Sequence, residues 1–213
     1  MADTIGLDMS GDCRPFLPAI AASPVKIIGR YYRSTASSLT PLTFDEAVAI
    51  SQADLSILAL WEWTSDEIGN FSSANGKDQG TSAYNQARNT HQPAGTPIYF
   101  AVDGDFSAAQ IAGPIADYFT GVAQAFDLMG DGTSVYQIGV YGSGLCCSWL
   151  LDHQLATYTW LAGSTGWQQP GFADWDVKQG FDDFNIAGLK AGANGDYDTD
   201  LATDSAGAFQ VAG

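Results

Sequence analysis

Eight short apolar runs, separated by helix or turn signals, are the feature that most restricts how this chain can fold. Each run is rich in β-branched or aromatic residues and has the length of a single strand. Strands that alternate with helices predict a parallel sheet, and eight of them favour a closed (β/α)8 barrel over an open doubly wound sheet. A chain of 213 residues suits one such barrel, so we predict a single α/β, TIM-like barrel domain over residues 1–213. The runs are TIGLDMS, VKIIGRYY, SILALWEW, PIYFAVDGD, YQIGVYGS, TYTWLAGS, WDVKQG and DYDTDLA.

The connections between the runs carry helix signals of uneven strength. The segment 43–52 opens with a capping-box pattern, and the segment 107–130 has apolar residues at helical spacing, with Pro114 marking a kink or a late start. The polar segment 78–92 predicts a mostly solvated helix. After the segment 144–154 the connections are loop-like, so we expect the barrel's helices to be short or missing in the C-terminal third.

Charge and composition exclude several classes of protein. The chain has 24 acidic against 8 basic side chains, which opposes binding to nucleic acid. No run approaches the roughly 18 apolar residues of a membrane span, and we expect no membrane partner. The opening residues lack the pattern of a secretory signal, so we expect a cytoplasmic monomer that reaches an extracellular substrate only through lysis or non-classical secretion.

Acidic residues stand at the ends of several predicted strands, where barrels of this kind build their active sites. Residues two apart on a strand share a face, and barrel closure makes the first and eighth strands neighbours. We therefore expect the acids to converge, so that at least one keeps a proton near neutral pH. Paired carboxyl groups of this kind perform glycoside hydrolysis. The candidate catalytic residues are Asp8, Glu62, Asp103, Asp105 and Asp198.

Aromatic residues at the same strand ends offer apolar faces to sugar rings. Trp61 and Trp63 flank Glu62, so they face away from it. No histidine pair or EF-hand spacing accompanies the acids, and we expect neither a metal ion nor a cofactor. The candidate substrate-binding residues are Tyr31, Tyr32, Tyr141, Trp160 and Gln179.

The order of these motifs resembles a known family. "IGLDMS", "IIGRYY", "IYFAVDGD", "IGVYGS" and a final "YDTDLA" are similar to the glycoside-hydrolase-like barrel domain of unknown function found in bacteria and fungi, a relative of the family 25 lysozymes. The resemblance spans nearly the whole chain. It implies catalytic roles for Asp8, Asp103, Asp105 and Asp198. The lysozymes have Glu at the position of Asp105, so the proton donor here is one methylene shorter.

Two functions fit these residues. The first is hydrolysis of a polysaccharide, with peptidoglycan as the leading substrate, Asp105 as proton donor and Asp103 or Asp198 as the second carboxylate. Glu62 is the reserve acid. The second function is that of a catalytically weak or inactive barrel that binds cell-wall glycan or another carbohydrate. The shorter Asp105 favours binding, whereas the presence of every other acid favours catalysis.

The three cysteines, Cys13, Cys146 and Cys147, have no metal-like spacing, so we predict buried, reduced thiols. Cys146 and Cys147 should resist alkylation until the protein unfolds, because only an exposed thiolate is nucleophilic. Mass spectrometry after iodoacetamide treatment, with and without urea, measures this. Rapid modification of all three in the native state would contradict the prediction.

Overall fold

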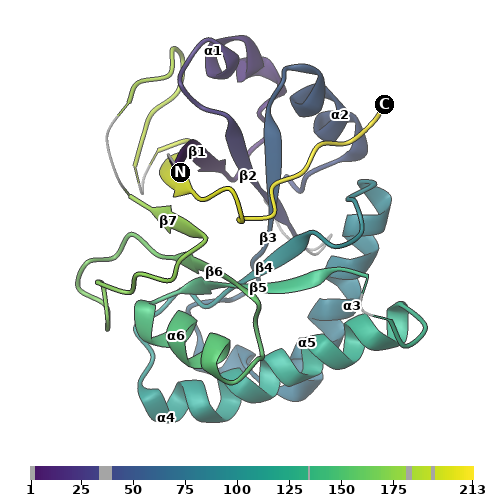
Figure 1. Cartoon of the computed structure of the whole chain (residues 1–213), viewed down its shortest axis with the longest axis vertical. Helices are drawn as coiled ribbons and strands as arrows, with labels where there is room; N and C mark the ends of the chain where they lie inside the picture. Colours follow the sequence, from purple (N-terminus) through teal and green to yellow (C-terminus); the bar gives the residue numbers. More distant parts are fainter. Residues whose placement is uncertain (1–2, 34–39, 134, 181–183, 193–194) are drawn as a thin grey trace.

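Each of the eight apolar runs forms a strand in the computed structural model, which describes residues 3–33, 40–133, 135–180, 184–192 and 195–213. The strands close into one barrel in chain order, which confirms the predicted fold class (Figure 1). The strands are β1 (Thr4–Met9), β2 (Ile27–Tyr32), β3 (Ser56–Trp61), β4 (Pro97–Ala101), β5 (Gln137–Gly142), β6 (Tyr158–Leu161), β7 (Val177–Gln179) and β8 (Asp198–Ala202).

The eighth strand differs from the expected barrel in its direction. The first seven strands pair in parallel, but β8 is antiparallel to both β7 and β1. A parallel β8 would need a crossover to the far end of the barrel. No helix occurs among the described residues between β7 and β8, so β8 starts at the end where β7 stops. Asp198 therefore lies at the beginning of its strand, opposite Asp8 as predicted.

Helices cover the outside of the barrel. The expected helices around 43–52, 107–130 and 144–154 are present, and Thr43, Ser107 and Ser143 cap them. In the described part of the chain none follows α6, as predicted. Pro114 lies in a π-helical turn that joins α4 to α5. The helical segments are η1 (Arg14–Phe16), α1 (Leu17–Ala21), α2 (Phe44–Gln52), η2 (Ile68–Asn70), α3 (Ser73–Asn89), α4 (Ala108–Gln110), η3 (Ile111–Ile115), α5 (Ala116–Met129) and α6 (Gly144–Asp152).

The helix α3 begins earlier than predicted and is not mostly solvated. It packs along α5, with which it lies side by side in Figure 1. Two glycines allow the close approach: a Cβ at Gly76 would lie 2.0 Å from the carbonyl oxygen of Tyr118, and one at Gly121 would lie 2.2 Å from that of Ser73. The sequence did not predict this buried face, because small residues rather than large apolar ones form it and the hydropathy of α3 is therefore low.

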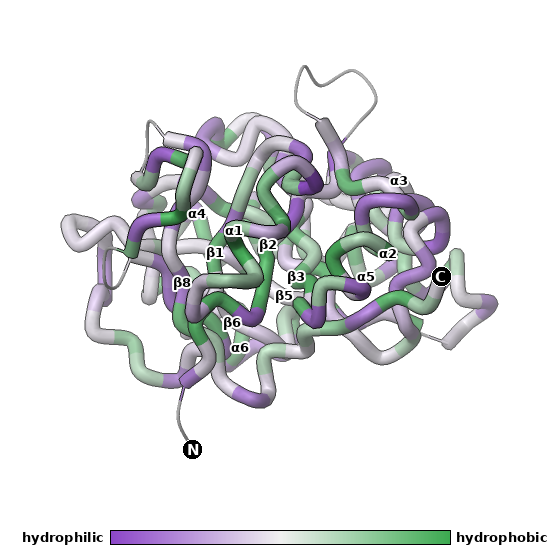
Figure 2. The backbone as a smooth tube through the Cα atoms, turned by 90° about the horizontal axis from the view of Figure 1, so that it is seen from above, coloured by the Kyte–Doolittle hydropathy of each residue, from purple (hydrophilic) through white to green (hydrophobic). Residues whose placement is uncertain are grey.

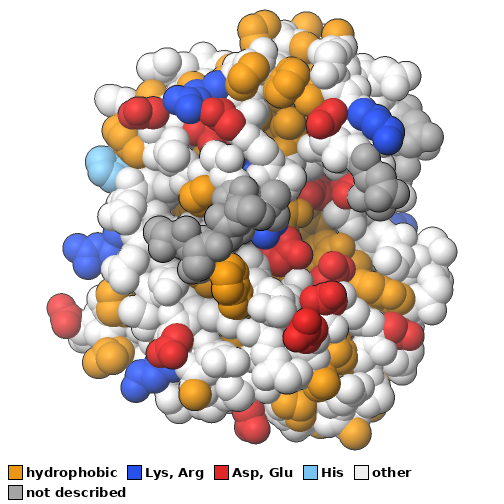
Figure 3. Space-filling model, turned by 180° about the vertical axis from the view of Figure 1, so that it is seen from behind, with side chains coloured by type: hydrophobic (Ala, Val, Ile, Leu, Met, Phe, Trp, Pro, Cys, Tyr) orange, Lys and Arg blue, Asp and Glu red, His pale blue; other side chains and the backbone are white. Residues whose placement is uncertain are grey.

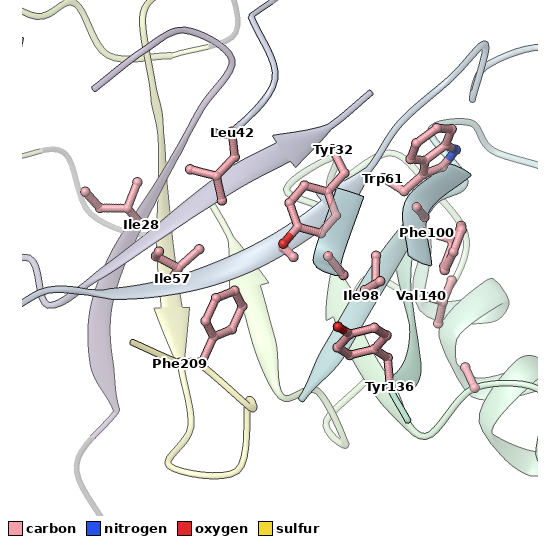
Figure 4. Packing of buried hydrophobic residues seen from close by; sticks show 14 of the residues in the cluster. Ile28, Tyr32, Leu42, Ile57, Trp61, Ile98, Phe100, Tyr136, Val140 and Phe209 are labelled. Carbon is pink, nitrogen blue, oxygen red and sulfur yellow. The ribbon is translucent and has the colours of Figure 1, made fainter. Parts of the chain in front are cut away.

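Alternation along the strands separates two apolar layers. Outward residues such as Ile28, Ile57 and Phe100 pack beneath the helices, as Figure 4 shows. Figure 2 shows hydrophobic stretches along the central strands and hydrophilic ones in outer turns. The three thiols are buried and unpaired, in agreement with the sequence prediction. No helix among the described residues has the length and hydropathy needed to cross a membrane.

The inward residues fill the barrel itself. Tyr99 and Trp160 are fully buried there and meet edge to face, with ring centroids 5.4 Å apart. Two glycines leave room for them: a Cβ at Gly139, the register partner of Tyr99 on the adjacent strand, would lie 2.6 Å from the Tyr99 ring, and one at Gly29 would lie 2.7 Å from the Trp160 ring. The interior of the barrel is thus a packed core rather than a pore.

A buried ion pair joins the barrel to α2. The Arg30 guanidinium and the Glu46 carboxylate are almost fully buried, with Nε 2.7 Å from Oε1. Arg30 also donates to the carbonyl oxygen of Met9, and Glu46 accepts from the backbone N–H of Cys13. The pair therefore links β1, β2 and α2 through hydrogen bonds that satisfy both charges.

The α3–α5 contact generates a stability prediction. Gly121→Ala should lower the free energy of unfolding by about 1–3 kcal/mol, because its Cβ meets backbone atoms that cannot rotate away. Urea unfolding measures the loss. The matched control is Gly69→Ala in η2, whose Cβ would meet nothing within 4 Å and which should change stability by less than about 0.5 kcal/mol. Equal effects of the two substitutions would refute the close-packing explanation.

Candidate active site

A cavity of about 520 Å³ opens at the carboxyl ends of the parallel strands. Three predicted acids, Glu62, Asp103 and Asp198, line it. Figure 3 shows Asp and Glu side chains gathered around a hollow on one face of the molecule. The remaining lining residues are mostly aromatic, small or uncharged: Tyr31, Leu60, Ala101, Tyr141, Gly163, Ser164, Trp167, Gln179 and Gly180.

Glu62 directly follows β3, Asp103 lies two residues after the end of β4, and Ser65 contacts both. The backbone N–H of Asp103 donates to the carbonyl oxygen of Ser65 at 2.8 Å. The Ser65 hydroxyl donates to Glu62 Oε1 at 3.1 Å, while Arg33 lies 3.2 Å from Glu62 Oε2. Arg33 also lies over the Tyr31 ring, with its Cζ 4.7 Å from the ring centroid. These contacts place two carboxyl groups from adjacent strands on the same wall of the cavity.

Asp8 lies deeper, within a chain of hydrogen bonds that includes three of the predicted residues. Tyr31 donates its hydroxyl to Asp8 Oδ1 at 2.7 Å, and the Gln179 amide donates to Asp8 Oδ2 at 2.8 Å. The Tyr141 hydroxyl donates to Gln179 Oε1 at 2.9 Å. The network therefore fixes the orientation of both tyrosines and of Gln179 at the cavity wall.

Burial and like charge keep several of these acids protonated at higher pH than usual. Burial raises the pKa of Asp8 to about 7, although its hydrogen bonds from Tyr31 and Gln179 oppose the shift. Burial, with the nearby Glu62 carboxylate, raises the pKa of Asp103 to about 6. Burial also raises the pKa of Asp198. The cavity thus contains carboxylic acids that can hold a proton near neutral pH.

The structure does not place Asp105 beside Asp103, as the alternation argument had assumed. The strand β4 ends at Ala101, so the two-residue periodicity does not extend to Asp105. Asp105 is exposed and does not line the cavity; its Oδ1 accepts from the backbone N–H of Gln168 at 3.0 Å. It anchors the loop that carries Trp167.

Two predicted substrate-binding residues do not reach the cavity either. Tyr32 neighbours Tyr31 in β2 and therefore points outward, where its hydroxyl bonds to Thr90 and Gln92 beneath the helices. Trp160 faces inward but is fully buried below the cavity. The outward placement of Trp61, whose indole donates to Gln79, agrees with the expectation from its position beside Glu62.

Sequence reasoning missed Trp167 and left Asp200 out of the candidate set. Trp167 lines the cavity from the loop after β6, and an aromatic residue in a loop at this end of a barrel is a signal that could have revealed it. Asp200 lies two residues beyond Asp198 on the same face of β8. In the part of the chain that the structure describes, no three His, Cys, Asp or Glu side chains come together to hold a metal ion.

Sequence comparisons identify relatives of this barrel. The family model described as "Rv2525c-like, glycoside hydrolase-like domain" matches residues 18–201. The uncharacterized protein YbfG of Bacillus subtilis (strain 168) is 33% identical over 153 residues, which is 66% of this chain and 20% of YbfG. The chain thus spans about a fifth of the length of this relative.

Solved structures share the fold at low sequence identity. The Tat-secreted protein Rv2525c of Mycobacterium tuberculosis, in complex with L-tartrate, has a TM-score of 0.74 at 20% identity, covering 96% of this chain and 98% of that one. The catalytic domain of endolysin ply40, from bacteriophage P40 of Listeria monocytogenes, has a TM-score of 0.61 at 10% identity and coverages of 96% and 95%. A family 25 glycosyl hydrolase from Bacillus anthracis has a TM-score of 0.52 at 11% identity and coverages of 93% and 88%. The resemblance to family 25 is therefore confirmed at the level of fold.

The pairing of Glu62 with Asp103 makes a prediction that needs no substrate. The Asp103 carboxyl should titrate near pH 6, and Glu62→Gln should lower that midpoint, because the substitution removes a neighbouring negative charge. Carboxyl ¹³C NMR measures both midpoints. Asp105→Asn is the control and should leave the Asp103 midpoint unchanged. An unaltered midpoint in Glu62→Gln would show that the two groups do not interact.

Proposed function

The chain belongs to the family of Rv2525c-like, glycoside hydrolase-like domains, and on that premise we propose that it hydrolyses the glycosidic bonds of a polysaccharide. The observation that carries the proposal is that Glu62 and Asp103 line one cavity, Glu62 paired with the Arg33 guanidinium and Asp103 with a raised pKa. Glycoside hydrolysis needs one carboxylic acid that retains its proton and a second carboxylate that is ionised. Environments that separate two acids in this way define their roles.

Asp103 is the proton donor in this proposal. With a pKa of about 6, it is largely protonated in mildly acidic solution and can transfer its proton to the oxygen of the leaving sugar. Its backbone is fixed by the bond to Ser65, so the acid is held in place before the substrate arrives. Activity should accordingly decline as the pH rises above about 6, because the acid loses its proton.

Glu62 is the ionised partner. The Arg33 guanidinium and the Ser65 hydroxyl contact separate oxygens of its carboxylate, and both stabilise a negative charge. A carboxylate in this position can activate water or stabilise the positive charge that develops on the sugar ring in the transition state. Asp198, on the same cavity, is the further carboxyl group available to the reaction.

Peptidoglycan is the first substrate to test. The catalytic domain of a bacteriophage endolysin has the same barrel, and the cavity presents faces of Tyr31, Tyr141 and Trp167 beside its acids. Aromatic faces of this kind suit the apolar faces of sugar rings.

A carbohydrate-binding barrel without turnover is the second candidate function. The position of Asp105 favours it, because the acid that the resemblance assigns as proton donor lies outside the cavity. Such a protein would retain glycan through the tyrosines and Trp167 and release no product.

Substitution of the two aspartates separates these assignments. Asp103→Asn should reduce the release of reducing ends from peptidoglycan by about 10²–10⁴-fold, the usual contribution of a general acid. Asp105→Asn should retain activity within a few-fold of wild type, because Asn still accepts the hydrogen bond from Gln168. Reducing-end assays between pH 4 and 8, together with melting temperatures, measure these effects.

Full activity in Asp103→Asn together with no activity in Asp105→Asn would contradict this assignment. Asp105 would then be the proton donor. If wild type releases nothing from peptidoglycan or chitin but is retained by either glycan in a pull-down, the binding function replaces the hydrolase.

A further inference from the structure

Asp200 lies below the proposed reacting groups, and the mechanism above does not use it. The register of β1 and β8 pairs Asp8 with Asp198 and Gly6 with Asp200. Residues two apart on a strand share a face, so all three aspartates point into the barrel. Gly6 has no side chain, and a Cβ there would lie 3.4 Å from the Cβ of Asp200. The gap leaves space for the Asp200 carboxyl group beside Asp8.

The hydrogen bonds of this carboxyl group are incomplete as long as it is ionised. Asp200 is 2% exposed, and its Oδ1 accepts from the Trp160 indole at 3.1 Å. Its Oδ2 is buried and has no hydrogen-bond partner. The neighbouring Asp8 carboxylate raises the pKa of Asp200, so the two carboxyl groups lie near each other in the barrel. A buried acceptor without a partner costs free energy. A proton shared between the two carboxyl groups removes this cost, because it turns one acceptor oxygen into a donor.

We propose that Asp200 is a positioning residue whose Oδ2 carries a proton and donates a hydrogen bond to the Asp8 carboxylate. Asp8 then accepts from three donors, namely Tyr31, Gln179 and Asp200. Trp160 holds the opposite oxygen of Asp200, so the donor keeps one orientation. The consequence for catalysis rests on the proposed function: Asp200 fixes the charge and the position of Asp8 beneath the bound sugar.

The surroundings of Asp200 favour its protonated form. Burial raises its pKa well above the ordinary value for Asp, and the neighbouring charge of Asp8 raises it further. Of the two acids, Asp200 has the single donor and Asp8 has two, which assigns the proton to Asp200. The titratable groups that face the pair from the packed strands are Tyr31 on β2, Glu62 after β3, Asp103 after β4, Tyr141 on β5 and Asp198 on β8.

The pH dependence of stability tests the shared proton without any substrate. The folded protein holds this proton at pH values where an unfolded Asp, with a pKa of about 4, has lost it. The folded state therefore binds more protons than the unfolded state, and stability falls as the pH rises toward the folded pKa. In wild type, each unit by which the pH rises in this range should therefore raise the unfolding equilibrium constant by up to about tenfold.

Asp200→Asn should remove this contribution. The Asn side chain keeps an acceptor for Trp160 and a donor for Asp8, but it has no proton to release. Urea unfolding between pH 5 and 8 should give a slope smaller by one proton than in wild type. Asp204→Asn, at an exposed position after β8, is the control and should keep the wild-type slope. Equal slopes for wild type and Asp200→Asn would overturn the proposal.

Carboxyl ¹³C NMR of the wild-type protein provides a measurement that does not depend on a variant folding. One carboxyl group of the Asp8–Asp200 pair should remain protonated above pH 7. In Asp8→Asn the midpoint of Asp200 should fall, because the neighbouring charge is gone. Two carboxyl groups that are both ionised at pH 6 would refute the shared proton.

Activity then tests the positioning role. Asp200→Asn should keep kcat within about fivefold of wild type at pH 6, whereas Asp200→Leu, which offers no donor, should lose about a hundredfold in kcat with little change in KM. Equal losses in the two variants would show a structural role only. If wild type shows no turnover, the proposed hydrolase fails, while the unfolding slopes still decide whether Asp200 holds the proton.

Discussion

The contact between Tyr99 and Trp160 fills the barrel below the site, and the Trp160 indole donates to Asp200. These two rings occupy the space that Gly29 and Gly139 leave free. The Tyr99 hydroxyl donates a hydrogen bond to the carbonyl oxygen of Ala206. This filling forms the floor of the site, and the deeper carboxyl groups, Asp8 and Asp200, are buried there. Burial of the deeper carboxyl groups, and hence their raised pKa values, follows from that floor.

Some acids of the site lie within regular paired strands, and others lie in the segments that follow them. Asp8, Asp198 and Asp200 are part of paired strands, so their relative positions are set by the register of the barrel. Glu62 and Asp103 lie just beyond their strands and depend on Ser65 to hold them together. This arrangement places the proposed proton donor at the rim, where a leaving group needs it, and the fixed charges below.

Strand periodicity accounts for most of what could be predicted and for the clearest errors. It identified all eight strands, and the closure of eight strands into a barrel predicted the meeting of Asp8 with Asp198. The same rule excludes Tyr32 from the cavity once Tyr31 faces it, so the prediction that Tyr32 binds substrate was wrong. Asp105 could not be placed, because its position depends on a loop contact with Gln168 that has no local signature. The direction of β8 was also hidden, since the composition of a strand is the same in either direction.

The antiparallel closure also determines the order in which the molecule can fold. The strands β1 and β8 pair although six strands and their connections separate them in sequence, and such distant contacts form slowly. During synthesis the first seven strands emerge while the edges of β1 and β7 still lack a neighbour, and open edges invite pairing with other chains. Pairing of the short segment Asp198–Ala202 with both edge strands therefore converts an aggregation-prone open sheet into a barrel without edges.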